Sequence, residues 1–361
     1  MSEAFSPFIF NPMTVSSTAP GRLARDILSQ YPLIGHNPVI VPLRNAGGFS
    51  GAAIWRVEGS AGRFCLRAWP PGRPTPQRLR MIHVWLRVAA EAALDFVPRV
   101  IEESVGGTSI EYDGRLWEVT TWMPGQADYR ASPSPARLEA ACLALAQLHR
   151  AWEQTAAATG ICPAIIRRLE CVRDWNALVG SGWRPLNTVP HEDPVRPWAE
   201  RAWPILQARI PAVPGRLADW VTREMPLQAC LCDVWHDHVL FTGNAVTGLI
   251  DFGGAKVDHV AIDLARLLGS MVHDDAEAWA AGLKAYAGAA NCSSQDVALI
   301  RALHETGTVL GAASWLMWLY KHQRPFDDRT AVARRLRELV EQMERWHHRH
   351  YYLNRDARGS P

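Results

Sequence analysis

The sequence predicts an α+β protein with two lobes, a small β-rich lobe followed by a larger helical one. The chain has 361 residues, which is long enough for two lobes with a hydrophobic core each. Short apolar runs separated by turn residues, typical of strands, gather in the first third of the chain, whereas the pattern after residue 263 is helical. We therefore expect a flexible arm over residues 1–21, a first lobe over 22–123 and a second lobe over 124–361.

Composition and charge narrow the classes of function. The chain is 48% hydrophobic and 20% charged with a net charge of +2, as in a soluble globular protein without a nucleic-acid partner. No apolar run reaches membrane-spanning length, and the N-terminus lacks the features of a signal peptide. Seven scattered cysteines favour reduced thiols and a cytoplasmic location. The sequence carries no signal for the oligomeric state.

The first lobe is expected to hold strands around one long helix. Thr75 precedes Pro76 and begins a helix that runs to about Leu94, with a rough apolar face. Asp113-Gly114 is a strong hairpin signal. The expected strands lie within residues 39–57 (two strands), 63–69, 96–101, 109–112 and 116–122.

The second lobe is expected to be mainly helical. Ser134 caps its first helix, whose apolar stripe runs from Leu138 to Trp152. Ser293 and Asp296 form a capping box at the start of another helix. The least regular region, residues 161–226, holds one clear helix. The expected helices after the first are 197–209, 263–272, 275–286, 293–320 and 328–350.

A glycine-rich loop joins the first two strands, over residues 45–51. Gly47, Gly48 and Gly51 let backbone amides approach phosphate oxygens closely, and Ser50 can add a hydroxyl group. The alternative is a plain glycine turn between strands.

Two aspartates flank a predicted hairpin within residues 231–254. Val239–Phe241 and Leu249–Ile250 are apolar runs of the kind found in buried strands, and hairpin residues separate them. Asp233 and Asp251 stand just outside the two ends. Either alone would be unremarkable in a turn. Together they suit phosphoryl transfer, in which one carboxylate accepts the proton of a hydroxyl group and the other holds Mg²⁺ on the nucleotide phosphates.

This stretch resembles the catalytic segment of the aminoglycoside phosphotransferase and choline kinase-like families, which are small-molecule kinases with the protein-kinase fold. Their pattern is His-Gly-Asp, four residues, Asn, a short hairpin, Ile-Asp-Phe/Trp-Gly and a later Asp-Leu-Ala. The resemblance implies that Asp233 is the catalytic base and Asp251 a metal ligand, and Asp263-Leu-Ala265 matches the later element. It implies a two-lobed protein-kinase-like fold for most of the chain, with specific motifs only over 231–265.

Three positions depart from that pattern. Leu231 stands in place of the histidine, Cys232 in place of the glycine and His238 in place of the asparagine. The asparagine of the family binds a second metal ion. His238 is therefore expected either to bind the metal, which would favour Mn²⁺ over Mg²⁺, or only to hydrogen-bond the loop.

The resemblance also implies nucleotide contacts in the first lobe. Arg67 occupies the position of the lysine that reaches the α- and β-phosphates, and an arginine can do this with its planar fork. The glutamate that usually pairs with this base is missing from the early part of the following helix, so Arg67 has no assigned partner. Trp122-Met-Pro-Gly125 resembles the hinge, where the carbonyl of Thr121 and the amide of Met123 would bind adenine.

The implied reaction is transfer of the γ-phosphate of ATP, or GTP, to a hydroxyl group of a small molecule, with Mg²⁺ or Mn²⁺. The acceptor cannot be identified. Acidic residues of the second lobe can attract an amine, as in aminoglycoside kinases, or can be ordinary surface charges; they are Asp274, Asp275, Glu277 and Glu305.

Two alternatives stay open. A catalytically impaired nucleotide-binding protein would explain the altered motif. A metal-dependent hydrolase could be centred on residues Trp235 to His238. A zinc site of Cys230, Cys232, His236 and His238 is a related hypothesis, although the spacing fits no common zinc pattern.

Overall fold

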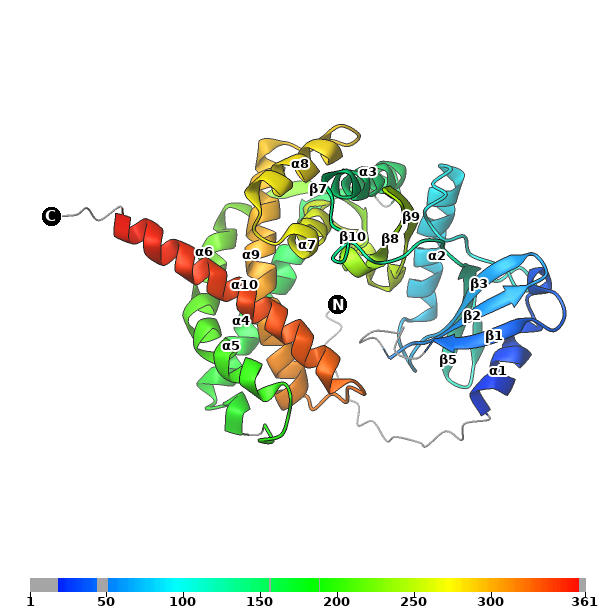
Figure 1. The fold of residues 1–361 in the computed structure, drawn as a ribbon, viewed down its shortest axis with the longest axis horizontal. Coiled ribbons are helices and arrows are strands. Elements are labelled where there is room, and N and C mark those ends of the chain that lie inside the picture. The colour runs from blue at the N-terminus through cyan, green and yellow to red at the C-terminus, as the bar shows by residue number, and fades with distance from the viewer. Residues whose placement is uncertain (1–18, 44–50, 156, 188, 357–361) are drawn as a thin grey trace. The chain divides into compact units, whose positions relative to one another are not determined.

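The computed structural model describes residues 19–43, 51–155, 157–187 and 189–356, which form two compact units (Figure 1). The first unit comprises residues 1–152 and 237–255, and the second comprises 153–236 and 256–361. The hairpin segment 237–255 therefore belongs with the N-terminal part of the chain. The predicted lobe boundary after residue 123 and the predicted arm over 1–21 stay predictions, although Ala19 already begins a helix.

A five-stranded antiparallel sheet with the order β1-β2-β3-β5-β4 forms the centre of the first unit (Figure 1). Its core is apolar: Val57, Leu66 and Val119 are fully buried, and the rings of Trp55 and Trp117 stack at 5.4 Å. The elements are α1 (Ala19–Leu28), β1 (Val39–Leu43), β2 (Ala53–Gly59), β3 (Gly62–Ala68), α2 (Pro76–Glu91), β4 (Ile110–Tyr112), β5 (Arg115–Thr121), α3 (Pro135–Trp152), β8 (Val239–Thr242) and β9 (Ala245–Leu249).

Helices α2 and α3 begin at the predicted caps. The hydroxyl group of Thr75 accepts a hydrogen bond from the Arg78 amide, and that of Ser134 accepts one from the Arg137 amide. The indole of Trp152, at the end of α3, donates to the carbonyl of Trp85 on α2 at 2.8 Å. Because both tryptophans are buried, this bond fixes the two helices against each other.

The β8–β9 hairpin is anchored to the rest of the first unit at both strands. The Leu249 amide donates to the Phe96 carbonyl at 2.6 Å, and Gln126 and Phe241 exchange two backbone hydrogen bonds. Gly248 packs so closely that an added Cβ would lie 2.8 Å from the Met123 Cβ. The hairpin is therefore a rigid base for the residues that follow β9.

The second unit contains a three-stranded sheet, β10-β7-β6, and helices that surround α9 (Figure 1). Buried leucines and alanines along α9 face α4, α5, α7 and α10. The elements are β6 (Ala158–Ile161), α4 (Pro163–Gly180), α5 (Arg196–Arg209), α6 (Val213–Leu217), β7 (Glu224–Cys230), β10 (Lys256–Asp258), α7 (Ala261–Val272), α8 (Ala276–Ala287), α9 (Ser294–Leu316), a π-helical turn (Met317–Lys321) and α10 (Arg329–Asp356).

Three expectations about elements are corrected. Residues 96–101 form no strand, because only Val100 pairs, in a single bridge with Thr120. Residues 161–226 hold more than one clear helix: Pro163 opens α4, whose buried face includes Ile165 and Trp175. The predicted helix 293–320 changes to a π-helical turn at Met317. None of the described helices is long and apolar enough to cross a membrane.

His304 gives the second unit a pH-dependent stability. Its ring lies between Trp279 and Trp346, at 5.0 Å and 5.6 Å, and Gln342 is 3.0 Å from Nε2. Burial lowers the pKa of His304 to about 4. His304 therefore binds a proton near pH 6.5 in the unfolded chain but only near pH 4 in the folded unit. The free energy of unfolding thus falls as the pH drops from about 6.5 to about 4.

We expect His304→Gln to flatten this dependence. The loss of unfolding free energy between pH 7 and pH 5 should be smaller in the variant than in the wild type by about 2 kcal/mol, whatever its stability at pH 7. Urea unfolding at both pH values measures the difference. His191→Gln, which changes an exposed histidine of the same unit, is the control. Equal pH dependence in wild type and His304→Gln would contradict the prediction.

Candidate active site

The predicted site residues fall into three groups. Gly47, Gly48 and Ser50 lie outside the described residues, and Gly51 is described as a turn residue with φ +76°. The first unit contains Arg67 on β3, Thr121 at the end of β5, the buried Met123, and two residues beside the hairpin, His238 and Asp251. Asp233 lies in the second unit.

The guanidinium group of Arg67 has two carboxylate partners. Nη1 lies 3.2 Å from Asp251 Oδ1, and Nε lies 3.8 Å from Glu118 Oε1. The group also lies over the Trp69 ring, 4.7 Å from its centroid. Burial by itself would lower the pKa of Arg67, but the neighbouring carboxylates of Asp251 and Glu118 raise the pKa by more than burial lowers it. The guanidinium group therefore stays positively charged.

Glu118 is the partner that the sequence did not identify. It lies directly opposite Arg67 in the pairing of β3 with β5, and its side chain is buried. His83 of α2 reaches the same carboxylate, with Nε2 2.6 Å from Oε2, and its Nδ1 lies 2.8 Å from the Thr108 hydroxyl group. Helix α2 is thus connected to Arg67 through Glu118. The sequence did offer one signal for Glu118, since it is a charged residue between the apolar residues Trp117 and Val119, which the structure buries.

Asp251, two residues after the end of β9, takes an uncommon backbone conformation. Its φ of 62° and ψ of 66° lie in the left-handed region, which costs a non-glycine residue about 1 kcal/mol or more. The following Phe252 is buried against Trp152, and a Cβ on Gly253 would come within 2.6 Å of the Trp69 ring. The Asp-Phe-Gly sequence therefore fits this turn. Asp251 adopts the left-handed conformation, Phe252 fills a buried position, and Gly253 has no Cβ that would collide with Trp69.

Two basic groups flank the Asp251 carboxylate. Arg67 contacts Oδ1, and His238 Nε2 lies 3.6 Å from Oδ2. Burial alone would raise the pKa of Asp251, but Arg67 and then His238 oppose it, and the net effect holds the pKa below its usual range. The carboxylate is 40% exposed, so a ligand can reach it.

The donor set next to the hairpin suits a divalent cation. Asp251 offers a carboxylate oxygen and His238 an imidazole nitrogen, on rigid backbone tied by the bond from the Ile250 amide to the His238 carbonyl at 3.0 Å. Neighbouring donors bound at about 2.1 Å to one ion in octahedral geometry lie about 3 Å apart. The observed 3.6 Å is close to that spacing, so a small movement would let both groups bind one ion.

In the second unit, Asp263 holds the loop that precedes Asp233. Its buried carboxylate accepts hydrogen bonds from the amides of Leu231, at 2.7 Å, and Cys232, at 2.6 Å. Cys232 has a φ of 61°, in the region that favours the glycine of the family pattern. The loop therefore keeps the expected turn although both residues depart from the pattern.

Asp233 is half-exposed and forms an ion pair with Arg266 of α7. Arg266 follows Asp263 by three residues and so lies on the same face of the helix. One face of α7 thus supplies both the carboxylate that fixes the loop amides and the cation beside Asp233. The sequence did not identify Arg266; its spacing from Asp263 was the only signal.

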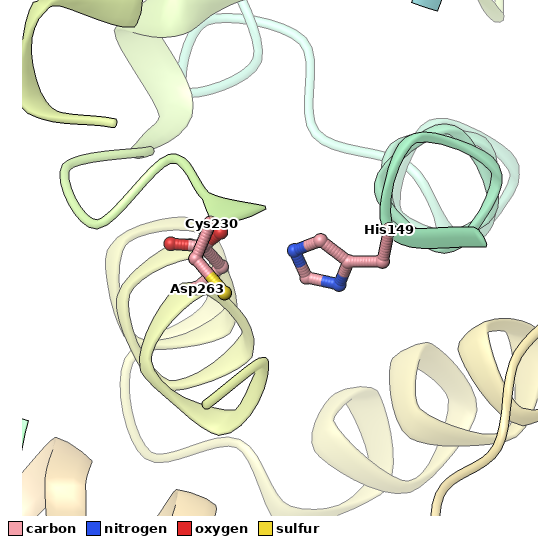
Figure 2. Close-up of side chains that lie close together, drawn as sticks. All are labelled: His149, Cys230 and Asp263. Atoms are coloured by element: carbon pink, nitrogen blue, oxygen red, sulfur yellow. The ribbon is translucent and has the colours of Figure 1, made fainter. Parts of the chain in front are cut away.

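The thiol groups near this loop are poor candidates for zinc ligands. Figure 2 shows Cys230, at the end of β7, with Asp263 of α7. Burial and the neighbouring Asp263 carboxylate raise the pKa of Cys230 well above its usual value, and burial together with Asp263 also raises that of Cys232. Both thiols are therefore protonated near neutral pH, whereas zinc binds thiolates. His236, also part of that hypothesis, is buried, and its amide donates to the Ser270 hydroxyl group at 2.9 Å.

Three of the four acidic residues considered as amine-binding groups have structural contacts. Asp274 contacts Arg345 and accepts a hydrogen bond from the Trp346 indole. Asp275 caps α8 by accepting from two amides, and Glu305 lies 3.7 Å from Arg216. Glu277 is exposed in the first turn of α8. These contacts favour the interpretation as ordinary structural and surface charges.

The model of the phosphotransferase enzyme family matches residues 43–296. Among curated proteins, the chain is 30% identical over 177 residues to a homoserine kinase of Methylorubrum populi, covering 49% of this chain and 48% of that protein. It is 39% identical over 93 residues to a homoserine kinase of Methylobacterium sp. (strain 4-46), covering 26% and 27%. The matched regions therefore span half or less of these relatives.

Several solved structures that share the fold are kinases or phosphotransferases by name. A spectinomycin phosphotransferase bound to ADP and spectinomycin has a TM-score of 0.65 at 10% identity, covering 90% of this chain and 97% of that one. An amicoumacin kinase bound to AMP-PNP and Ca²⁺ has a TM-score of 0.60 at 13% identity, covering 90% and 93%. An aminopropanol kinase has 0.59 at 16%, covering 90% and 97%. The predicted protein-kinase-like α+β fold is thereby confirmed.

We expect Glu118→Gln to destabilise the first unit by about 2 kcal/mol, because a buried arginine loses one of its two carboxylate partners and His83 loses a charged acceptor. Urea unfolding at pH 7 gives the free-energy difference. Glu111→Gln, on the exposed face of β4, should change stability by no more than about 0.5 kcal/mol. Equal effects of the two substitutions would mean that the contacts of Glu118 contribute nothing.

Proposed function

Because the chain belongs to the phosphotransferase enzyme family, we propose that it is a kinase that transfers the γ-phosphate of ATP, or of GTP, to a hydroxyl group of a small molecule with the help of a divalent cation. The observation that carries the proposal is the arrangement around Asp251. A partly exposed carboxylate with a lowered pKa lies between an arginine and a histidine at the end of a rigid hairpin.

The first unit would bind the nucleotide and its metal ion. Asp251 would hold Mg²⁺ on the phosphates, and His238 would be a second protein ligand of that ion. Arg67, positioned by Glu118, would contact the α- and β-phosphates through N–H groups not directed at its carboxylates. The metal ion would neutralise charge on the transferred phosphoryl group. Gly47, Gly48, Ser50 and Gly51 stay predicted phosphate contacts, and Thr121 and Met123 stay predicted adenine contacts.

Asp233 would act on the acceptor. As the acceptor oxygen bonds to the γ-phosphorus, the bond from that phosphorus to the bridging oxygen of the nucleoside diphosphate breaks. Asp233 would take the proton that the acceptor hydroxyl group loses. Arg266 would hold the Asp233 carboxylate in place until the acceptor arrives. The family pattern, not the structure, assigns this role to Asp233.

The names of the relatives suggest several chemical classes of acceptor. Homoserine kinases are the relatives similar in sequence, and the structural neighbours include kinases of spectinomycin, amicoumacin and aminopropanol. A transfer assay with γ-labelled ATP and GTP, in Mg²⁺ and in Mn²⁺, over hydroxy amino acids, amino alcohols, aminoglycosides and sugars tests the proposal. Acceptor-dependent formation of a phosphate ester is the expected result. Nucleotide binding without transfer to any acceptor would instead indicate a catalytically impaired protein.

We expect Asp233→Asn to lower kcat at least a hundredfold while nucleotide affinity stays within a factor of about two, because only proton acceptance and alignment of the hydroxyl group are removed. Steady-state kinetics and calorimetry measure the two effects. Asp219→Asn, the same substitution at an exposed aspartate of the same unit, is the control. Activity of Asp233→Asn within a few-fold of the wild type would exclude Asp233 as the base.

His238 gives a prediction about metal preference. If its imidazole binds the metal, it should favour Mn²⁺, and His238→Asn should shift the preference towards Mg²⁺, since Mg²⁺ prefers oxygen ligands. The ratio of the rates in Mn²⁺ and Mg²⁺ should fall severalfold in the variant. Metal affinity of the wild type should also weaken as the pH falls through the histidine range, because only neutral imidazole coordinates. An unchanged rate ratio would show that His238 acts on the loop alone.

A further inference from the structure

His83 is a buried histidine of α2 that has no role in the reaction proposed above. Its side chain is 2% exposed, and each ring nitrogen contacts a polar group. Nε2 lies 2.6 Å from Glu118 Oε2, and Nδ1 lies 2.8 Å from the Thr108 hydroxyl oxygen. Buried polar atoms are unfavourable without partners, so these two bonds fix the orientation of the imidazole.

The two hydrogen bonds of His83 have a direction. A carboxylate only accepts hydrogen bonds, so Nε2 carries a hydrogen and donates it to Glu118. When the ring is neutral, Nδ1 is an acceptor, and the Thr108 hydroxyl group donates to it. Thr108 lies in the segment between α2 and β4 and thereby selects the tautomer that Glu118 needs. Thr108, His83 and Glu118 therefore form a directed chain that ends beside Arg67.

His83, rather than Arg67, determines where the Glu118 carboxylate lies. The bond from His83 is short, whereas Arg67 Nε is 3.8 Å from Oε1, beyond the range of a hydrogen bond. The strand register places Glu118 opposite Arg67, but a glutamate side chain has several rotatable bonds and can point elsewhere. Without the imidazole, the negative charge that faces Arg67 would lose its fixed position.

Metal binding increases the importance of this position. Arg67 has two carboxylate partners in the structure. In the proposed complex Asp251 binds the cation, so Glu118 becomes the carboxylate that orients Arg67. The Arg67 side chain is 15% exposed, and Nη2 takes no part in either contact, which leaves it for a phosphate oxygen. A binding group must be held close to its productive geometry, and for Arg67 this support comes from Glu118 and His83.

Helix α2 also holds the backbone after the Asp-Phe-Gly turn. Nη2 of Arg78 donates to the carbonyl of Gly254, at 3.4 Å, and to that of Ala255. Arg78 and His83 belong to the same helix, so α2 is connected to Arg67 through one residue and to the turn through the other. The relative position of the phosphate-binding and metal-binding groups therefore depends on α2.

We propose that His83 is a positioning residue for nucleotide binding: it holds the Glu118 carboxylate, which in turn orients Arg67 towards the α- and β-phosphates. Helix α2 thus contributes to phosphate binding through a histidine and a glutamate of β5, although it lacks the early glutamate of the family pattern. The inference rests on the proposed nucleotide site. It adds a residue whose effect must pass through Arg67, and this gives it a specific test.

Two amide substitutions separate the hydrogen bond from the bulk of the side chain. The amide nitrogen of glutamine reaches the place of Nε2, whereas that of asparagine reaches only the place of Nδ1. We expect His83→Asn to weaken Mg²⁺–ATP binding about tenfold, because the hydrogen bond to the charged Glu118 is lost, and His83→Gln to stay within about threefold of the wild type. Adenosine, which has no phosphate, should bind to both variants within about twofold of the wild type. Calorimetry on the full-length protein measures the dissociation constants.

The effect should disappear when Arg67 is absent. In an Arg67→Ala background, His83→Asn should change the affinity for Mg²⁺–ATP by less than about twofold, since the residue that it positions is missing. The same loss with and without Arg67 would overturn the proposal. Ile82→Val, at a buried neighbouring position of α2, is the control for a disturbed helix and should leave the ratio of the ATP and adenosine affinities unchanged.

Thr108→Val tests the same chain from its other end and leaves the buried imidazole in place. Valine has nearly the shape of threonine but cannot donate to Nδ1, so the tautomer that donates to Glu118 is no longer selected. We expect the affinity for Mg²⁺–ATP to fall about threefold, with no change for adenosine and no fall in the Arg67→Ala background. An unchanged affinity for Mg²⁺–ATP would contradict the directed chain.

The outcomes distinguish this inference from the kinase function. If His83→Asn binds Mg²⁺–ATP as the wild type does, or loses affinity for ATP and adenosine equally, His83 has only a structural role and the kinase function stands. If the wild type binds adenosine as tightly as Mg²⁺–ATP, the phosphate site and the inference both fail. If His83→Asn shows the expected loss while the wild type transfers phosphate to no acceptor, the positioning role stands and the kinase function fails.

Discussion

The buried guanidinium group of Arg67 sets the charge balance of the first unit. Burying a charge is unfavourable unless it is paired, and Arg67 is paired with Glu118 and Asp251. The single positive charge of Arg67 does not balance its two carboxylate partners, and the excess negative charge is partly exposed at Asp251. A divalent cation would neutralise that excess. The same contacts therefore explain why the cluster is stable without a ligand and why it suits a metal–nucleotide complex.

In the second unit, hydrogen bonds to a buried carboxylate hold the loop that precedes Asp233. Asp263 binds the backbone amides of Leu231 and Cys232 rather than their side chains, so the substitution of the histidine and glycine of the family pattern removes none of these hydrogen bonds. The remaining cost is the Cβ of Cys232 in a left-handed conformation, about 1 kcal/mol. A buried carboxylate that receives two short hydrogen bonds can offset this cost. The altered motif is thus compatible with the expected backbone around Asp233.

Local patterns predicted much of this structure. Thr75, Ser134 and Ser293 cap helices because capping depends on neighbours within one turn, and Asp113-Gly114 makes its hairpin for the same reason. The partner of Arg67 was missed because Glu118 is 51 residues away and is brought opposite Arg67 only by the register of β3 and β5. The strand predicted at 96–101 failed because apolar residues and a proline also suit an irregular segment. The glycine-loop residues 47, 48 and 50 lie outside the described part of the chain.

Charge composition says little about the acceptor, because most charged groups near α8 and α10 already have partners. Asp274 and Glu305 contact arginines, Asp275 binds helix amides, and Asp193 is buried with both oxygens engaged. Several of the ion pairs in this unit are unequal, with a buried carboxylate and an accessible guanidinium group, as in Arg329 with Asp193 and Arg167 with Asp258. The number of arginines is visible in a sequence, but which of them a ligand can reach depends on packing.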